Sequence, residues 1–162
     1  MNRTFTITFA VGIVVMAIVV SGILYMQRGA RIGISGEILK VRTAALDENS
    51  SVAVIDFRFA NPSNVLFEVR SVTVLMEEND GKQYPGQVAS ELDAKRLFDA
   101  LPLLGQKFND TLKIRDEVPP HSTADRMVAV RFEAPESRIQ ARKRFLMRIE
   151  EVDGANSEIS EK

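Results

Sequence analysis

The sequence has no cysteine and no tryptophan, and only one of its 162 residues is a histidine. Without cysteine, the chain cannot form a disulfide, a zinc-thiolate site, an iron–sulfur cluster or a thiol nucleophile. The single histidine, His121, follows Pro119-Pro120 in what reads as a turn, with no second histidine to complete a zinc site or a catalytic triad. We therefore predict no catalytic residue, no metal site and no cofactor.

Positive and negative charges nearly balance, with 21 lysines and arginines against 22 aspartates and glutamates. Proteins that bind nucleic acid usually carry a basic stripe, so we predict no nucleic-acid partner. We interpret the acidic groups as solvated charges at strand ends, because none has the spacing of a calcium-binding loop. These groups are Glu77-Glu78 with Asp80, Asp116-Glu117, and Glu150-Glu151 with Asp153.

One long run, the 22 residues from Phe5 to Met26, contains no charged side chain. As a helix rising about 1.5 Å per residue it would be ~33 Å long, close to the ~30 Å hydrocarbon core of a bilayer. We predict a single transmembrane helix that acts as an uncleaved signal anchor. A cleaved signal peptide is the alternative, but its apolar region usually has about 7 to 15 residues, and GILYMQRGA offers no cleavage pattern.

The positive charges on the two sides of this run are nearly balanced, with Arg3 before it and Arg28 and Arg31 after it, so the positive-inside rule does not decide its orientation. A short tail followed by a large domain is typical of anchors that place the C-terminal domain outside the cytoplasm, and we predict that arrangement. The C-terminal end is polar and has little to bury, so we expect it to be disordered. The expected organisation is an N-terminal tail (1–4), the transmembrane helix (5–26), a linker (27–35), a folded domain (36–153) and a disordered tail (154–162).

Beyond residue 36, apolar and polar residues alternate as they do in half-buried strands. This pattern predicts strands over 36–46, 51–62, 66–78, 111–115, 124–134 and 144–152, with a bulge or a break near Arg70-Ser71 where the alternation slips. Asn79-Asp80-Gly81 predicts a hairpin turn, after which residues 82–85 start a return strand, and Asn61-Pro62 ends the second strand. Three sets of side chains should face the core: Ala53, Ile55, Phe57 and Phe59; Val128, Val130 and Phe132; Phe145, Met147 and Ile149. In the second strand, the intervening residues should face water: Val54, Asp56 and Arg58.

A helix is predicted over 91–101, because Ser90 and Asp93 form a capping arrangement and Pro102 ends the pattern. Its apolar residues recur at helical spacing: Ala94, Leu97, Phe98 and Leu101. We expect the helix to cover an open end of the domain and complete the core. The alternative is a docking surface for a partner, formed by Leu97, Phe98 and Leu101.

Seven or so short strands, separated by proline and glycine turns and one inserted helix, favour a mainly β fold. We predict an immunoglobulin-like or fibronectin-like β-sandwich, preceded by the transmembrane helix. A small β-barrel is the alternative.

The segment VAVIDFRFANPSNVLFEVRSVTVLMEENDG resembles the water-stress and hypersensitive-response (WHy) domains, which are related to late-embryogenesis-abundant sandwich proteins. The similarity lies in an alternating strand, the pair Asn61-Pro62, a second strand and a turn that ends in Gly81. VPPHSTADRMVAVRF also fits their layout, whereas the helix near 91–101 departs from it. The resemblance implies a β-sandwich with a binding or stress-related role and no catalytic residue.

The densest basic stretch is a candidate contact with anionic lipid or an acidic partner, formed by Arg138, Arg142, Lys143 and Arg144, with Arg148 beyond them. We favour the simpler interpretation, an outward polar face balanced by Glu136, Glu150 and Glu151. From the whole sequence we predict a membrane-anchored, non-enzymatic domain that binds a protein or scaffolds an envelope complex. A WHy-like stress-protection module is the first alternative, and an enzyme or ligand-binding domain whose site is not readable from sequence is the second.

Overall fold

The computed structural model describes residues 3–27 and 33–161, and the chain divides between residues 31 and 32 into two compact units. The first unit contains helix α1 (Arg3–Gln27), which includes the run predicted as a membrane anchor. Within the described ranges, no helix combines the length and the apolar character needed to cross a membrane. Residues 1–2 of the predicted N-terminal tail and residues 28–32 of the predicted linker lie outside the described part of the chain.

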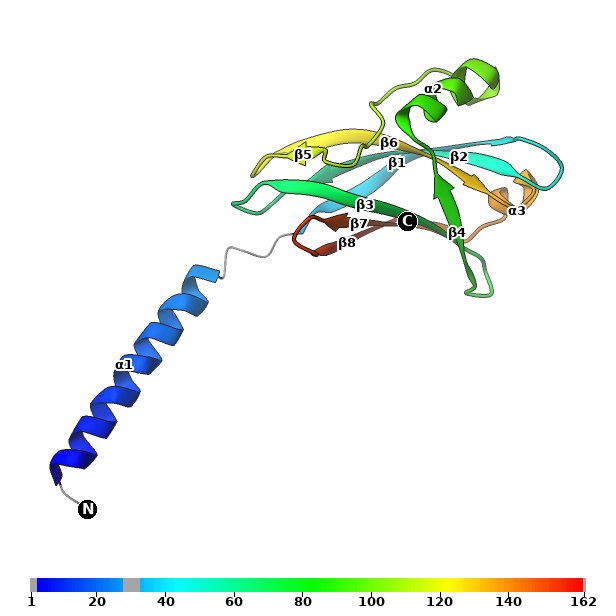
Figure 1. The fold of residues 1–162 in the computed structure, drawn as a ribbon. Coiled ribbons are helices and arrows are strands. Elements are labelled where there is room, and N and C mark those ends of the chain that lie inside the picture. The colour runs from blue at the N-terminus through cyan, green and yellow to red at the C-terminus, as the bar shows by residue number, and fades with distance from the viewer. Residues whose placement is uncertain (1–2, 28–32, 162) are drawn as a thin grey trace. The chain divides into compact units, whose positions relative to one another are not determined.

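The second unit is mainly β, as predicted, and its strands are all paired antiparallel (Figure 1). Its strands are β1 (Ser35–Ala45), β2 (Ser51–Ala60), β3 (Phe67–Glu77), β4 (Gln83–Val88), β5 (Glu117–Val118), β6 (Thr123–Phe132), β7 (Arg144–Glu151) and β8 (Asn156–Ser160). Its helices are α2 (Glu91–Ala100), the short 3-10 helix η1 (Pro102–Leu104) and α3 (Glu136–Gln140).

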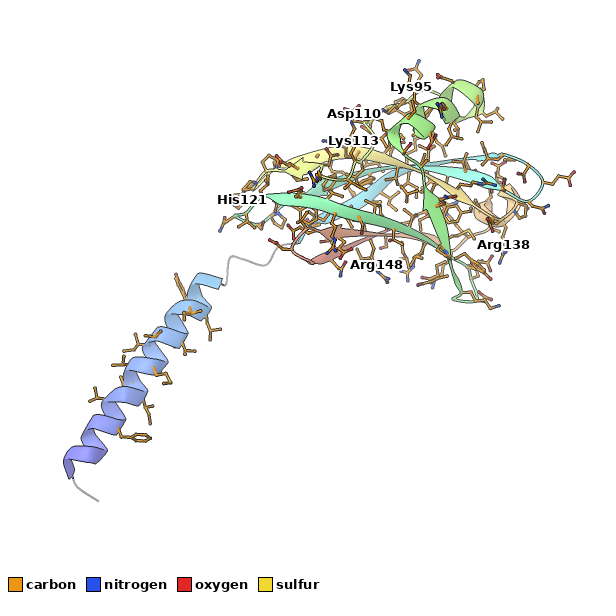
Figure 2. The ribbon with its side chains drawn as sticks, viewed as in Figure 1. Lys95, Asp110, Lys113, His121, Arg138 and Arg148 are labelled. Atoms are coloured by element: carbon orange, nitrogen blue, oxygen red, sulfur yellow. The ribbon has the colours of Figure 1, made fainter. Side chains whose placement is uncertain are left out.

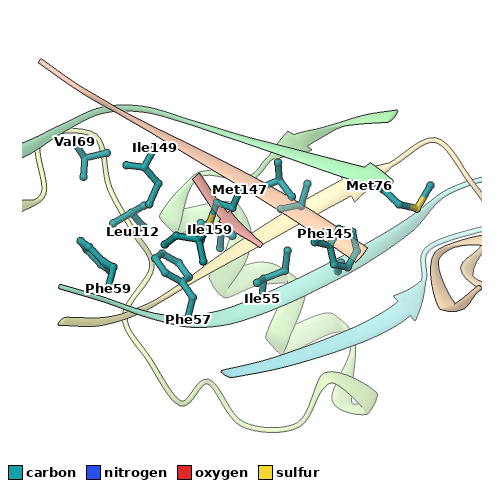
Figure 3. Close-up of a cluster of buried hydrophobic side chains, with 14 of the residues drawn as sticks. Ile55, Phe57, Phe59, Val69, Met76, Leu112, Phe145, Met147, Ile149 and Ile159 are labelled. Atoms are coloured by element: carbon teal, nitrogen blue, oxygen red, sulfur yellow. The ribbon is translucent and has the colours of Figure 1, made fainter. Parts of the chain in front are cut away.

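The strands form one sheet in the order β1-β2-β6-β4-β3-β7-β8, and β5 pairs with the start of β3. β4 connects two parts of this sheet, because its residues 83–86 pair with β3 and Gln87 and Val88 pair with β6. The sheet thus curls into two layers, a first layer of β1, β2 and β6 and a second layer of β3, β7 and β8. The hydrophobic core lies between them (Figure 3).

The alternation in the sequence correctly predicts which side chains fill this core. All three predicted inward sets are buried in one cluster, from β2, β6 and β7. Among them, the ring of Phe57 stacks on Phe59 with centroids 5.5 Å apart, and Phe132 stacks on Phe145 at 5.6 Å. Figure 3 shows Phe57 and Phe59 opposite Ile149 across the interior. Alternation works here because each of these strands buries one face against the opposite layer.

Two local predictions in β3 and its hairpin are confirmed. The register of β3 against β7 shifts between Val69 and Ser71, at the predicted bulge. The turn after β3 closes with Glu78 N–H donating to Lys82 O at 2.9 Å, and Gly81 has a φ of 84°, a conformation that side chains other than glycine rarely adopt.

Gly86 lies where β4 leaves β3 for β6, and the crossing leaves no room for a side chain. A Cβ atom there would overlap Val130 Cγ1 and would lie 2.6 Å from two ring carbons of Phe132. Both neighbours are buried, so they could move only by repacking the core. We expect Gly86→Ala to lower the free energy of unfolding by about 1–3 kcal/mol.

Equilibrium urea unfolding of the full-length protein in mild detergent would measure this loss. Gly33→Ala is the matched control, because its Cβ would meet only Ser157 Oγ, at 3.8 Å. Equal unfolding midpoints for the two variants would contradict the expectation.

Most of the outer face of β2 is covered rather than in water, and this corrects the sequence prediction. Val54 is fully buried in a second apolar cluster, and Asp56 is only 2% exposed. Arg58 alone of the three predicted outward residues is exposed. The reason is that α2 lies over the outer face of the first layer (Figure 1), rather than over an open end of the sandwich.

Two other predictions are wrong. Residues 111–115 do not form a strand; Thr111 makes only an isolated parallel bridge with Met127, and Arg115 has a φ of 67°. The segment predicted as a disordered tail contains β8, which pairs with β7 and buries Ile159 in the core. One well-placed apolar side chain and a full backbone ladder are enough to order this strand, although its composition is polar. The start of the unit is joined to it, because Ile34 N–H donates to Ser157 Oγ at 2.9 Å.

Candidate functional site

Exposed apolar side chains are concentrated in one part of the second unit, the insertion (residues 89–116) between β4 and β5. Among the described residues of the second unit, every large apolar side chain that is more than half exposed lies in the insertion. These side chains are Leu92 (57% exposed), Leu103 (89%), Phe108 (60%) and Ile114 (73%). Large exposed apolar patches commonly mark interaction sites, whereas single exposed apolar residues need no explanation.

Helix α2 starts as the sequence predicts, with the Ser90 hydroxyl accepting a hydrogen bond from Asp93 N–H at 3.2 Å. Its underside packs on the outer face of the first layer. Ala94 of α2 and Leu104 of η1 are buried there, against Ala44, Val52, Val54, Met127 and Ala129.

The three predicted docking residues, Leu97, Phe98 and Leu101, are partly buried and pack against the same cluster. They therefore contribute to the attachment of the insertion, and the more exposed apolar residues of the insertion lie around them in sequence. Whether the three residues also contact a partner remains a prediction.

A buried ion pair lies beneath the insertion. Arg42 of β1 and Asp56 of β2 are joined by a contact of 2.8 Å, with side chains 10% and 3% exposed. Nη2 of Arg42 makes this contact, and the second terminal nitrogen, Nη1, donates hydrogen bonds to the carbonyl oxygens of Leu104 at 2.6 Å and Gln106 at 2.7 Å. Asn109 Nδ2 donates to the second carboxylate oxygen of Asp56 at 2.9 Å. The pair thus connects the sheet to both ends of a short loop.

Two aromatic rings complete this arrangement. The guanidinium carbon of Arg42 lies 5.3 Å from the centroid of Phe98 and 5.0 Å from that of Phe108. Lys40 Nζ also lies 5.0 Å from the Phe108 ring. These are distances at which a cation is attracted to an aromatic ring. Phe108 is consequently held over the sheet while more than half of its surface is exposed.

Two hollows border the insertion. One, of about 470 Å³, includes Leu46, Leu97 and Arg131 in its lining. The other, of about 550 Å³, is mostly apolar, and Val72, Leu112 and Ile114 are among its lining residues. Lys113 Nζ lies 2.9 Å from Glu91 Oε2, and both residues line the second hollow. Both volumes are within the usual range of binding pockets.

The basic stretch is placed among carboxylates. Arg138 pairs with Glu78, Arg142 with Glu161, Lys143 and Arg144 with Glu77, and Arg148 with Glu158. These carboxylates differ from Glu136, Glu150 and Glu151, which were expected to balance the stretch; strand register places Arg144 opposite Glu77 and Arg148 opposite Glu158. Figure 2 shows Arg138 and Arg148 at separate places on the surface. Contact of this stretch with anionic lipid or a partner remains a prediction.

Glu77 pairs with two of these basic side chains and is itself buried. Lys143 Nζ donates to its carboxylate at 2.7 Å and Arg144 Nε donates at 3.0 Å. These hydrogen bonds, that from Lys143 first, hold the pKa of Glu77 below its ordinary value, because they favour the ionised carboxylate.

The single histidine and the acidic groups do not come together in one site. His121 is exposed in a turn, with Nε2 2.7 Å from Asn64 Oδ1, and Figure 2 places it far from Arg138. Asp116, from one of the acidic groups, pairs with Arg126 at 2.9 Å. In the described part of the chain, no group of three or more histidine, aspartate or glutamate side chains could hold a metal ion.

Sequence reasoning missed the residues that organise the insertion, namely Arg42, Asp56 and Asn109. One signal was available. Asp56 interrupts the most apolar strand, SVAVIDFRF, and a carboxylate with apolar residues on both sides often has a buried partner. The identity of that partner was not accessible, because Arg42 lies 14 residues away and Asn109 lies 53 residues away.

No family model matches the sequence, and no curated protein matches it. Among solved structures, the chain is similar to the archaellum periplasmic stator protein FlaG from Sulfolobus acidocaldarius, with 14% identity and a TM-score of 0.37 over 78% of this chain and 98% of that one. It is also similar to an uncharacterized β-sandwich protein from Clostridium difficile 630, with 12% identity and a TM-score of 0.41 over 80% of this chain and 85% of that one. At these values neither likeness assigns a function to this chain.

Proposed function

We propose that the protein is a membrane-anchored, non-enzymatic domain that binds a protein partner through its insertion. The observation that carries the proposal is the concentration of exposed apolar side chains in residues 92–114. Apolar side chains held on a rigid framework are typical anchors of protein interfaces. A non-enzymatic domain anchored in a membrane is best suited to hold its partner in an envelope complex, as a scaffold.

The charges of the insertion favour a protein over a lipid surface or nucleic acid. Helix α2 carries three acidic and two basic side chains: Glu91, Asp93, Asp99, Lys95 and Arg96. Such a mixture gives no net attraction to phosphates, which would need a basic surface. It suits a partner whose own surface has an apolar patch with a mixed polar rim.

An immunoglobulin-like architecture is part of the proposal. In that fold, strands A, B and E share one layer and strands C, F and G share the other. Here β1, β2 and β6 form one layer and β3, β7 and β8 the other, in the same chain order, with β4 between them. The insertion then corresponds to a connection at which such domains vary.

The membrane anchor is proposed from the run of uncharged residues between Phe5 and Met26. Its described large apolar side chains are widely exposed along α1, from 48% at Val20 to 74% at Tyr25, and lipid would suit such a surface better than water. The orientation that places the second unit outside the cytoplasm follows from the short N-terminal tail and belongs to the same proposal.

Photo-crosslinking in native membranes tests the anchor and the partner together. A photoreactive amino acid at Leu103 should give an adduct with a discrete protein, whereas the same group at Val152, an apolar residue exposed at 45% in the β7–β8 turn, should not. Leu92→Ser with Phe108→Ser should reduce the Leu103 adduct at least about tenfold, which is the loss expected when two interface anchors are removed.

Three results would count against the proposal. Equal adducts from Leu103 and Val152 would indicate unspecific contact, and absence of any protein adduct would remove the partner. Recovery of the uncleaved chain in the supernatant after cells are broken without detergent would remove the anchor.

A WHy-like stress-protection role is the second candidate, and the side chain of Asn61 favours it. Asn61 is 1% exposed, donates to the carbonyl oxygens of Val65 and Val118, and accepts from Ser63, so it ties together the turn that ends β2. The pair Asn61-Pro62, on which the resemblance to WHy domains depends, thus stabilises the turn after β2. Suppression of client-enzyme aggregation by the full-length protein, unaffected by Leu92→Ser with Phe108→Ser, would favour this role over the first.

A further inference from the structure

The part of the insertion that carries Leu103 and Phe108, which we call the display loop (residues 101–110), has little structure of its own. Its internal backbone hydrogen bonds are those of η1, from Leu104 N–H to Leu101 O and from Gly105 N–H to Pro102 O, both 3.0 Å long. Only Leu104 within it is fully buried. A loop with so few contacts of its own would be expected to open readily.

Besides the backbone hydrogen bond from Met127 N–H to Asp110 O at 2.8 Å, the display loop is attached to the sheet by the side chain of Arg42. Its Nη1 donates to two carbonyl oxygens of the display loop, and its Nη2 is fixed by Asp56. The planar guanidinium can make these bonds in a fixed relative geometry, which a lysine ammonium cannot. Because Asp56 also accepts from Asn109, the same ion pair holds the loop near its beginning and near its end.

The burial of this pair is not explained by stability. Desolvating two charges costs about as much as their attraction returns, and apolar side chains of similar size often replace a buried pair without loss of stability. A buried pair is better explained by what it positions. Here it positions carbonyl groups of a loop that buries Leu104 but leaves Leu103 89% exposed and Phe108 60% exposed.

We propose that Arg42, fixed by Asp56, is the positioning residue of the display loop and holds Leu103 and Phe108 in a preformed arrangement for binding. The binding part of this statement rests on the proposed function, and the positioning part does not. A preformed loop loses less conformational entropy on binding than a mobile one, so it binds more tightly with the same contacts.

Hydrogen exchange of the full-length protein in mild detergent tests the positioning. The variant Arg42→Leu/Asp56→Leu removes both charges together and leaves no unpaired charge. The amide protons of Leu104 and Gly105 should then exchange at least about tenfold faster, because two charge-assisted hydrogen bonds no longer hold the loop. Amide protons of β7 should exchange as before, and trypsin should cleave after Lys107 more rapidly.

The matched control is Arg58→Leu/Asp125→Leu. This pair also joins the first layer, between β2 and β6, through bonds of 2.7 Å and 2.8 Å, but it touches no part of the insertion. Unchanged loop exchange in the Arg42 variant, or equal acceleration in the control, would overturn the proposal. If the double variant does not fold, Asn109→Ala replaces it, with an expected acceleration of about threefold to tenfold at the same amides; no acceleration would again overturn it.

Crosslinking from Leu103 separates this proposal from the proposed function. Accelerated exchange together with a weaker Leu103 adduct supports both. Accelerated exchange with an undiminished adduct overturns the claim that the fixed loop serves binding. If the wild-type protein gives no Leu103 adduct, the binding role fails, while the exchange result still decides whether Arg42 positions the loop.

Discussion

Asp56→Leu alone is expected to lower the free energy of unfolding by about 3–5 kcal/mol, because it leaves the Arg42 guanidinium charged, buried and without its carboxylate. Arg42 is 10% exposed, so water can replace little of the lost interaction. Asn109 loses its acceptor at the same time. Adding Arg42→Leu should restore most of the stability, since the double variant contains no unpaired charge.

Equilibrium urea unfolding of the wild type, both single variants and the double variant would measure this coupling. A loss below about 1 kcal/mol for Asp56→Leu would show that the pair is worth no more than an exposed ion pair. The control pair, Arg58 and Asp125, with side chains 50% and 35% exposed, should lose no more than that amount when either partner is replaced.

Phe57→Ala is expected to cost about 3–5 kcal/mol, through lost apolar burial and the cavity that remains. Phe57 is fully buried at the centre of β2 and stacks on Phe59, so the surrounding side chains cannot collapse into the space without disturbing both layers. Urea unfolding measures the effect. Leu103→Ala is the control and should change stability by less than about 0.5 kcal/mol, because Leu103 is 89% exposed. A loss for Leu103→Ala comparable with that for Phe57→Ala would contradict this account of the core.

The inward faces of β2, β6 and β7 could be predicted because local alternation reports burial directly. Phe57, Val130 and Met147 each face the opposite layer, and no information beyond the strand itself is needed to expect it. Turn and cap chemistry was equally local. Gly81 closes the β3–β4 hairpin, and Ser90 caps α2, each through bonds within a few residues.

Most of the errors have a common cause, because they depended on contacts outside the segment concerned. Val54 and Asp56 were expected in water, but α2 and the display loop, which come some 40 to 50 residues later in the sequence, cover them. β8 was expected to be disordered, because its composition is polar; its order comes from pairing with β7 and from Ile159. The candidate site depends on the same kind of contact, since Arg42 reaches a carbonyl group 62 residues away.

The hydrogen bond between Ile34 and Ser157 joins the beginning of the folded unit to the beginning of β8. From there β8 runs along β7 as far as Glu161, whose N–H donates to Phe145 O at 2.9 Å, so the last described residue lies near the start of β7 and not beside Ile34. Helix α2 and η1 pack on the outer face of the first layer, whereas β8 belongs to the second layer. A reporter or affinity handle joined at the C-terminal end would therefore follow a strand of the second layer, so capture from this end suits the search for a partner of the display loop.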